Sequence, residues 1–447
     1  MRMTTSLDRR HLLRLLALAS MGVAAAPALA ACGGEQDPGL KAAGDLGLVA
    51  ATVDRSQGDA AAVPLVATAL SGLAGRLYGE LAAGDGNLAL SPYSIAVALG
   101  MVLNGAGGTT ASQMESVLGL GDDLDLTAFN GGLNALTLEI EGLAGPVKRG
   151  DGSTAEIALA TANQLFGDRS VAWAPEFLDV LAREYGAGMR VVDYIHATEQ
   201  ARTLINDWTA EQTHDKIPQI IPDGVLDALT RLVLVNAIYL KAPWETPFME
   251  GSTTPGDFHR ADGSVVSADL MHGVAQGSLL TGPGWKGGRI LYAGGTLAMT
   301  VVVPEADRFA AVENALASQG THTLLTEPGP GEVMLTLPKW TFRSTSPLTG
   351  ALQSLGMSDA FDQGRADLDA MTPDPNDFYL TAVLHQAFIA VDEEGTEAAA
   401  ATAAVAGATS MPIRDELVVD RPFLFVIHDV AHGTPLFLGR VTDPTAG

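Results

Sequence analysis

Residues 230–248, TRLVLVNAIYLKAPWETPF, contain a nearly unbroken apolar run at positions 232–240 that is typical of a β-strand. Four further runs have the same strand-like character: residues 157–165, 297–303, 333–337 and 423–428. Helical spacing appears instead in residues 65–81, 94–103 and 201–211. Because helices dominate the first half and strands the second, the pattern predicts an α+β fold. No long Pro- or Ser-rich linker interrupts residues 64–445, which indicates one large domain.

The composition is that of a globular protein with a sizeable core, since 47% of the 447 residues are apolar and only 17% are charged. The formal net charge of −26 repels nucleic acid and anionic lipid headgroups, so we expect neither as a partner. The chain has a single cysteine, Cys32, and therefore no internal disulfide.

Residues 1–31 have the pattern of a secretory signal peptide, in which a basic region (RR at 9–10) precedes an apolar run that ends in small residues. The arginine pair resembles a twin-arginine signal, and LAAC at 29–32 resembles the lipobox of bacterial lipoproteins, in which the cysteine is acylated. A plain secretory signal with an incidental cysteine is the alternative. We therefore expect an exported protein, anchored at the cell envelope only through a lipid on Cys32 or extracellular. Residues 32–63 are expected to form a flexible tether.

The usual catalytic signatures are missing from the sequence, which has no G-x-S-x-G, H-E-x-x-H, C-x-x-C or Walker A pattern. Gly282, Gly284 and Gly287 fit G-x-G-x-x-G, but Pro283 lies inside the motif and a strand-like run follows, so a tight turn is favoured over a nucleotide site. We expect no catalytic residues, no metal site and no cofactor.

Residues 391–410, VDEEGTEAAAATAAVAGATS, form the most unusual segment. Alanine is the best helix former, so by itself the segment could be an alanine helix capped by Thr396. A flexible loop of small residues is equally plausible on propensity alone. The wider chain decides between these interpretations.

The chain strongly resembles the serpin family of protease inhibitors, through short motifs that occur in family order across residues 64–445. They are SPYSIA (91–96), INDW (205–208), QT (212–213), KI (216–217), the stretch 230–248, LPKW (337–340), LGM (355–357), DRPFLF (420–425) and FLGRV (437–441). The resemblance implies a serpin domain at 64–447 with three β-sheets, a large central sheet, eight or nine helices and an exposed reactive-centre loop. It also implies a mechanism in which a protease cuts the loop, is trapped as an acyl-enzyme, and is carried along as the loop inserts into the central sheet.

The resemblance assigns roles to individual residues. A polar cluster at which the central sheet opens is matched by Ser91, Ser94, Asn236 and His385. A second cluster, where the loop enters the sheet, is matched by Lys339, Glu393 and Trp244. The hinge of a mobile loop that runs from Glu393 to Ser410 is matched by Glu393, Glu394, Gly395, Thr396, Glu397, Ala398, Ala399, Ala400 and Ala401. The family's usual spacing from Glu393 places the cleaved bond between Thr409 and Ser410.

The hinge composition suits insertion as a strand, in which alternate side chains lie under the sheet. Counted from Thr396, these are Ala398, Ala400, Thr402, Ala404 and Ala406. All are small, and no proline occurs from 393 to 411. We therefore expect a monomeric inhibitory serpin rather than an enzyme, with a non-inhibitory carrier or interaction protein as the alternative.

The expected target is a serine endopeptidase. Small residues around the predicted bond suit elastase-like or subtilisin-like enzymes with shallow pockets. A papain-like cysteine protease is a further alternative.

Overall fold

Strand β6, Leu232–Pro243, contains the apolar run at 232–240 and lies in the middle of a sheet. It is described here in a computed structural model that covers residues 46–325, 331–373, 378–396 and 415–446. The chain divides into two units, and all of these residues belong to the second, Lys41–Gly447.

The described residues form eight α-helices, and the three helices predicted from the sequence are confirmed by α2, α3 and α7. The helices are α2 (Val63–Leu81), α3 (Pro92–Leu103), α4 (Gly108–Leu118), α5 (Leu126–Glu141), α6 (Pro175–Tyr185), α7 (Thr198–Gln212), α8 (Phe309–Gln319) and α9 (Leu348–Ser354). Four short 3₁₀ turns accompany them: Glu250–Ser252, Thr321–Thr323, Asp359–Phe361 and Asp369–Met371. Within the described part of the chain, none of the helices combines the length and the hydrophobicity needed to cross a bilayer.

The first sheet has the strand order β1-β5-β4-β6-β14-β13-β12 in the described residues, with β3 paired to β4 beside it. Its remaining strands are β1 (Gly47–Val49), β3 (Gly145–Lys148), β4 (Thr154–Asp168), β5 (Met189–Val192), β12 (Trp340–Pro347), β13 (Ala382–Val391) and β14 (Gly395–Thr396). β6 is antiparallel to β4 and parallel to β13. Parallel neighbours require a long connection, and the chain between β6 and β13 supplies it with six strands and two helices among the described residues.

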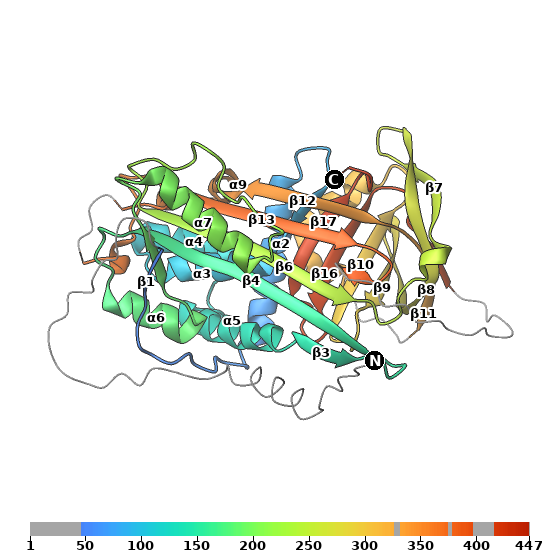
Figure 1. The fold of residues 1–447 in the computed structure, drawn as a ribbon, viewed down its shortest axis with the longest axis horizontal. Helices are drawn as coiled ribbons and strands as arrows, with labels where there is room; N and C mark the ends of the chain where they lie inside the picture. Colours follow the sequence, from blue (N-terminus) through green and yellow to red (C-terminus); the bar gives the residue numbers. More distant parts are fainter. Residues whose placement is uncertain (1–45, 326–330, 374–377, 397–414, 447) are drawn as a thin grey trace, which may run out of the picture. The chain divides into compact units, whose positions relative to one another are not determined.

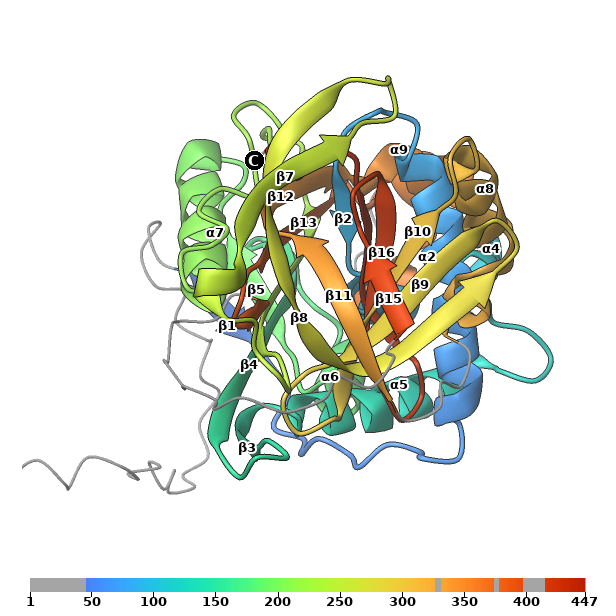
Figure 2. The same ribbon diagram turned by 90° about the vertical axis from the view of Figure 1, so that its right-hand side faces the viewer.

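The other strands form a second path, β15-β11-β8-β9-β10-β16-β17-β2, with β7 paired to β8. They are β2 (Leu88–Leu90), β7 (Thr254–His259), β8 (Val265–Gly282), β9 (Trp285–Leu291), β10 (Leu297–Pro304), β11 (Glu332–Pro338), β15 (Asp415–Val418), β16 (Phe423–Asp429) and β17 (Pro435–Val441). The first part of β8 pairs with β7 and β11, and its last six residues pair with β9 (Figure 2). The path thus comprises two sheets that share β8, which confirms the expected three-sheet α+β fold.

β6 is buried on both faces, so its sequence is a continuous apolar run rather than an alternating one. Val233, Val235 and Ala237 point to one face, where they pack with Ile205 of α7 in a small core. On the other face, Leu232, Leu234, Ile238 and Leu240 belong to the larger core. Figure 1 shows α7 lying across the first face of the sheet, and α3 packs on the opposite one. Two helices therefore cover the strand on which the candidate site is centred.

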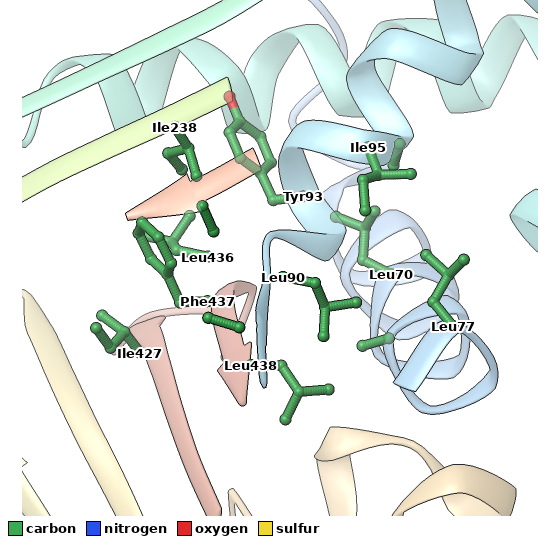
Figure 3. Packing of buried hydrophobic residues seen from close by; sticks show 14 of the residues in the cluster. Leu70, Leu77, Leu90, Tyr93, Ile95, Ile238, Ile427, Leu436, Phe437 and Leu438 are labelled. Atoms are coloured by element: carbon green, nitrogen blue, oxygen red, sulfur yellow. The ribbon is translucent and has the colours of Figure 1, made fainter. Parts of the chain in front are cut away.

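The larger core joins the sheets to the helices behind them. Figure 3 shows ten labelled side chains of this cluster, from α2, β2, α3, β6, β16 and β17, and each is at most 1% exposed. Burial of one such side chain contributes about 1.5–3 kcal/mol to stability. The Tyr93 hydroxyl keeps a hydrogen bond of 3.1 Å to Oγ1 of Thr137, so its polar atom is also satisfied.

Residues 46–62 are folded onto the domain, whereas the sequence predicted a flexible tether over 32–63. Gly47–Val49 forms β1 and pairs with β5. Arg55 donates to Asn134 Oδ1 at 2.8 Å, and the amide of Asp59 donates to the Gly131 carbonyl at 2.7 Å. The folded part therefore begins at or before residue 46, because these partners lie far away in the sequence. Residues 1–31, Cys32 and the rest of the tether up to 45 lie outside the described residues.

A glycine substitution tests the packing of β17 against β2. A Cβ added at Gly439 would lie 2.2 Å from the Leu88 carbonyl oxygen and 2.6 Å from the Phe425 ring. Gly439→Ala should therefore lower the free energy of unfolding by about 2–3 kcal/mol, as measured by denaturant or thermal unfolding. Gly350→Ala is the matched control, because nothing lies within 4 Å of its added Cβ in helix α9; it should raise stability by about 0.5–1 kcal/mol. Equal stability of Gly439→Ala and the wild type would contradict this packing.

Candidate functional site

The parallel strands β6 and β13 pair along only part of their length. Their register runs from Val233↔Ala382 to Ile238↔Ala387. Beyond that last pair the two strands are bridged by β14, in which Thr396 pairs with Ala242 of β6 and with Val391 of β13. We call the position just beyond the Ile238–Ala387 pair the fork. The chain that follows Thr396 thus starts from between the two strands.

A buried polar cluster lies around the Asn236–His385 pair, two residues before the last pair of β6 and β13. It is on the face of the sheet that packs against α3. The structure brings together the four residues that the sequence singled out, Ser91, Ser94, Asn236 and His385. The amide of Asn236 donates to Oγ of Ser94 at 2.6 Å, and the backbone N–H of Ser91 donates to Nε2 of His385 at 3.0 Å. His385 Nδ1 lies within hydrogen-bonding distance of Asn236 Oδ1. The cluster therefore connects α3 to β6 and β13 at the place where these strands separate.

Asn163 of β4 is a fifth member that the sequence did not single out. Its Oδ1 accepts from Ser94 Oγ at 2.7 Å and from Asn236 Nδ2 at 2.5 Å, and it is the cross-strand partner of Asn236. The one available signal was a polar amide within the apolar run at 157–165. Its partner could not be identified without the register of β4 and β6.

The contacts of His385 determine its tautomer. Because Nε2 accepts from the Ser91 N–H, the ring proton lies on Nδ1 and is donated to Asn236 Oδ1. Burial lowers the pKa of His385 to about 3. A second proton would face the Ser91 N–H with no acceptor, so this cluster requires the neutral imidazole.

Glu393 is held at the top of the sheet by the expected partner and by one that was not expected. Lys339 Nζ lies 2.8 Å from Oε2 of Glu393, and the Thr253 hydroxyl donates to Oε1 at 2.6 Å. Burial alone would raise the pKa of Glu393, but the hydrogen bonds from Lys339 and Thr253 outweigh it and hold this pKa below its ordinary value. The backbone amide of Phe248 also donates to the Glu393 carbonyl at 2.8 Å. Glu393 is therefore fixed through both its side chain and its main chain.

Trp244 supports the same segment from the end of β6. Its backbone amide donates to the Glu394 carbonyl at 2.8 Å, and its indole Nε1 donates to the Asp392 carbonyl at 3.0 Å. Its ring stacks on Tyr292 with centroids 4.6 Å apart. The Tyr292 hydroxyl in turn lies 2.6 Å from Oγ1 of Thr396, whose side chain is buried. Tyr292 was not predicted from the sequence, because it lies 104 residues before its partner.

Glu393, Glu394, Gly395 and Thr396 are thus fixed by the sheet, whereas the sequence predicted that the mobile loop begins at Glu393. The difference arises from contacts with Thr253, Phe248 and Tyr292, none of which can be inferred from the hinge itself. The remaining predicted hinge residues, Glu397, Ala398, Ala399, Ala400 and Ala401, lie outside the described residues, as does the predicted bond between Thr409 and Ser410. What the described arrangement provides is an anchored strand end between two strands whose direct pairing ends at Ile238 and Ala387.

Acidic, histidine and cysteine side chains are not gathered into a metal site in the described ranges, where no group of three or more could hold an ion. Gly282 and Gly284 lie in and just after β8, at the hairpin turn into β9, as the tight-turn interpretation predicted.

Comparison with known proteins gives a consistent result. The family model for "Serpin (serine protease inhibitor)" matches residues 68–444. Leukocyte elastase inhibitor A of Rattus norvegicus is 35% identical over 369 residues, which cover 80% of this chain and 93% of the relative. Among solved structures, the thermophilic serpin tengpin in its native state superposes with a TM-score of 0.75 at 26% identity, covering 84% of this chain and 94% of tengpin. Thyroxine-binding globulin in complex with thyroxine superposes with a TM-score of 0.73 at 25% identity, covering 85% and 99% of the respective chains.

The neutral state of His385 predicts a pH dependence of stability. Below about pH 6.5 the unfolded chain takes up a proton on this residue, whereas the folded protein does not until about pH 3. The contribution of His385 to stability is therefore fully present above pH 6.5 and declines as the pH falls, by up to about 1.4 kcal/mol per pH unit. Between pH 7 and pH 5, His385→Gln should lose about 2 kcal/mol less unfolding free energy than the wild type. Burial also lowers the pKa of His428, to about 4, and that effect is common to both proteins and cancels. If the unfolding free energy of the wild type and of His385→Gln changed with pH in the same way, the neutral state of His385 would be contradicted.

Proposed function

This chain belongs to the serpin family, and we propose that it is an inhibitory member that traps a serine endopeptidase by inserting its cleaved loop between β6 and β13. The observation that carries the proposal is the position of β14. Thr396 already pairs with the strands on both sides, and Gly395 pairs with β6, so the following residues need only continue the same strand. At the Asn236–His385 pair, buried hydrogen bonds hold β6 and β13 in addition to apolar packing.

The buried orientation of Thr396 fixes the alternation of side chains in the inserted strand. Its hydroxyl contacts Tyr292 and its side chain is 2% exposed, so residues 398, 400, 402, 404 and 406 would face the same interior. All of these are alanine or threonine, and the one charged residue of this stretch, Glu397, falls on the other face. An interior-facing charge or a proline would oppose insertion, and the sequence has neither.

The proposed reaction uses the chemistry of the target and the strand-forming capacity of this chain. The catalytic serine of the protease attacks the Thr409 carbonyl carbon and forms an ester, while the peptide bond breaks and Ser410 leaves with a protonated amine. Residues 397–409 then insert between β6 and β13 and carry the acylated enzyme with them. The anchors at Glu393 and Trp244 define the fixed end of this movement.

The proposed target is an elastase-like or subtilisin-like serine endopeptidase. The support is the small-residue sequence around Thr409 and Ser410, together with the rat relative, which is named as a leukocyte elastase inhibitor.

The N-terminal pattern supports export, with a signal peptide at 1–31 and a lipid anchor on Cys32 of a bacterial-type lipoprotein at the cell envelope. In that proposal, a tether from Cys32 to about residue 45 carries a monomeric domain that begins earlier than residue 64.

A non-inhibitory carrier is the second candidate, and the structural similarity to thyroxine-binding globulin in complex with thyroxine favours it. Such a protein could keep β14 in place without inserting the rest of the loop. A protease challenge separates the two functions, because only the inhibitor forms a covalent complex that survives denaturation by SDS.

Ala400→Arg should convert the inhibitor into a substrate. In the inserted strand residue 400 would face the same interior as Thr396, and burial of a guanidinium there would oppose insertion by several kcal/mol. Incubation with an elastase, followed by SDS gel electrophoresis, should show covalent complex for the wild type and only cleaved chain for the variant. Thr341→Arg, at an exposed position on β12 of the same sheet, is the matched control and should retain complex formation. An undiminished yield of complex with Ala400→Arg would refute the insertion mechanism.

The cleaved bond is a separate prediction. Amino-terminal sequencing of the small C-terminal fragment released from the denatured complex should begin at Ser410. Any other first residue would show that the register counted from Glu393 is incorrect.

A further inference from the structure

The turn that follows α7 has an unusual backbone conformation. His214 and Asp215 have φ angles of 51° and 61°, and only one other non-glycine residue in the described ranges has a positive φ. Side-chain-bearing residues occupy this region rarely, and they persist there when surrounding contacts hold them. We call His214, Asp215 and Lys216 the strap.

The strap contacts three strands of the central sheet. The His214 ring meets the ring of Tyr239 on β6 edge to face, with centroids 5.2 Å apart. Lys216 Nζ lies 5.3 Å from the centroid of Phe388 on β13. Arg343 of β12 donates from Nε to the Lys216 carbonyl at 2.8 Å, and its guanidinium carbon lies 5.5 Å from the same Phe388 ring. The aromatic ring of Phe388 therefore has two cations over it, one of them in the strap.

Tyr239 and Phe388 are the two residues that flank the fork. The last pair of β6 and β13 is Ile238–Ala387, so the next position on each strand is one of these aromatic residues. Both lie on the face that α7 covers, since Val235, Ala237 and Phe388 pack with its core. The strap thus spans the fork on one face, while the His385 cluster lies below it on the other.

Insertion of a strand at the fork is incompatible with keeping both contacts. A new strand between β6 and β13 moves Tyr239 and Phe388 apart by about 4.8 Å. A cation–π contact is effective only within about 6 Å of the ring centroid. The three-residue strap is too short to keep its contacts with both Tyr239 and Phe388 when these move apart. At least one side of the strap must therefore release before the new strand passes the fork.

We propose that His214 and Lys216, together with Arg343, are positioning residues that set the rate of strand insertion, and hence the division of cleaved molecules between trapped and released protease. The inference rests on the proposed inhibitory function. The strap stabilises the sheet before insertion and not after it, so weakening it accelerates insertion without changing the loop that the protease cleaves.

Peptide annealing to the full-length protein measures this step without a protease. A synthetic peptide with the sequence of residues 397–409 supplies the new strand, and its incorporation is followed by native gel electrophoresis. Lys216→Met and Arg343→Met each remove one cation from the Phe388 ring and should accelerate annealing about two- to five-fold. Lys216→Arg retains the cation and should anneal at the wild-type rate. Lys241→Met, the matched control on β6, should also leave the rate unchanged.

Thermal unfolding separates a positioning role from a general structural one. Lys216→Met should lower the midpoint of unfolding of the intact protein and leave that of the loop-cleaved, inserted protein unchanged, because the contact is already lost in the inserted form. An equal decrease in both forms, or annealing rates identical to the wild type for both methionine variants, would overturn the role of the strap. If the peptide anneals to none of the proteins, including the wild type, the insertion mechanism itself fails, and the strap proposal fails with it.

Discussion

Strand β6 pairs with β13 over only part of its length, and the arrangement of the whole site follows from this. Two parallel strands at the centre of a sheet would ordinarily exchange hydrogen bonds along their full length, yet here the pairing stops at Ile238 and Ala387. Above that point, within the described residues, the two strands are joined only through β14. The sheet therefore has a position for a strand that the described residues fill only at its upper end, and the same chain continues from that end.

Different forces act on the two faces of the fork. Below it on the core side, the neutral His385 and the amides of Asn236 and Asn163 connect both strands to α3, and burial makes a charged imidazole unfavourable. On the α7 side, cations and aromatic rings hold the strands from outside. Hydrogen-bond networks can be rearranged with new partners, whereas the strap contacts are lost when the strands move apart. If β6 and β13 move apart, the hydrogen-bond network on the core face can therefore adapt, whereas the strap contacts on the α7 face must break.

The sequence predicted the elements whose signal is local. The apolar runs at 157–165, 232–240, 297–303, 333–337 and 423–428 all lie in strands, and the three helical spacings lie in helices. Strand β1 was not predicted, because Gly47–Val49 is too short to show alternation and owes its structure to pairing with β5. Ser91, Ser94, Asn236 and His385 were identified by family resemblance, whereas Asn163, Tyr292 and the strap depend on contacts between residues that are distant in sequence. Their residue types gave no local indication of a partner.

In the proposed mechanism, the segment after Thr396 completes the sheet between β6 and β13 once it has been cut. The most direct measurement is the midpoint of thermal unfolding before and after a single cleavage between residues 397 and 414 by a protease that the protein does not trap. A large rise is predicted, because the inserted strand gains hydrogen bonds on both sides and removes the unpaired stretch above the fork. An unchanged midpoint after complete cleavage would rule out insertion, since the cut loop would then have remained outside the sheet.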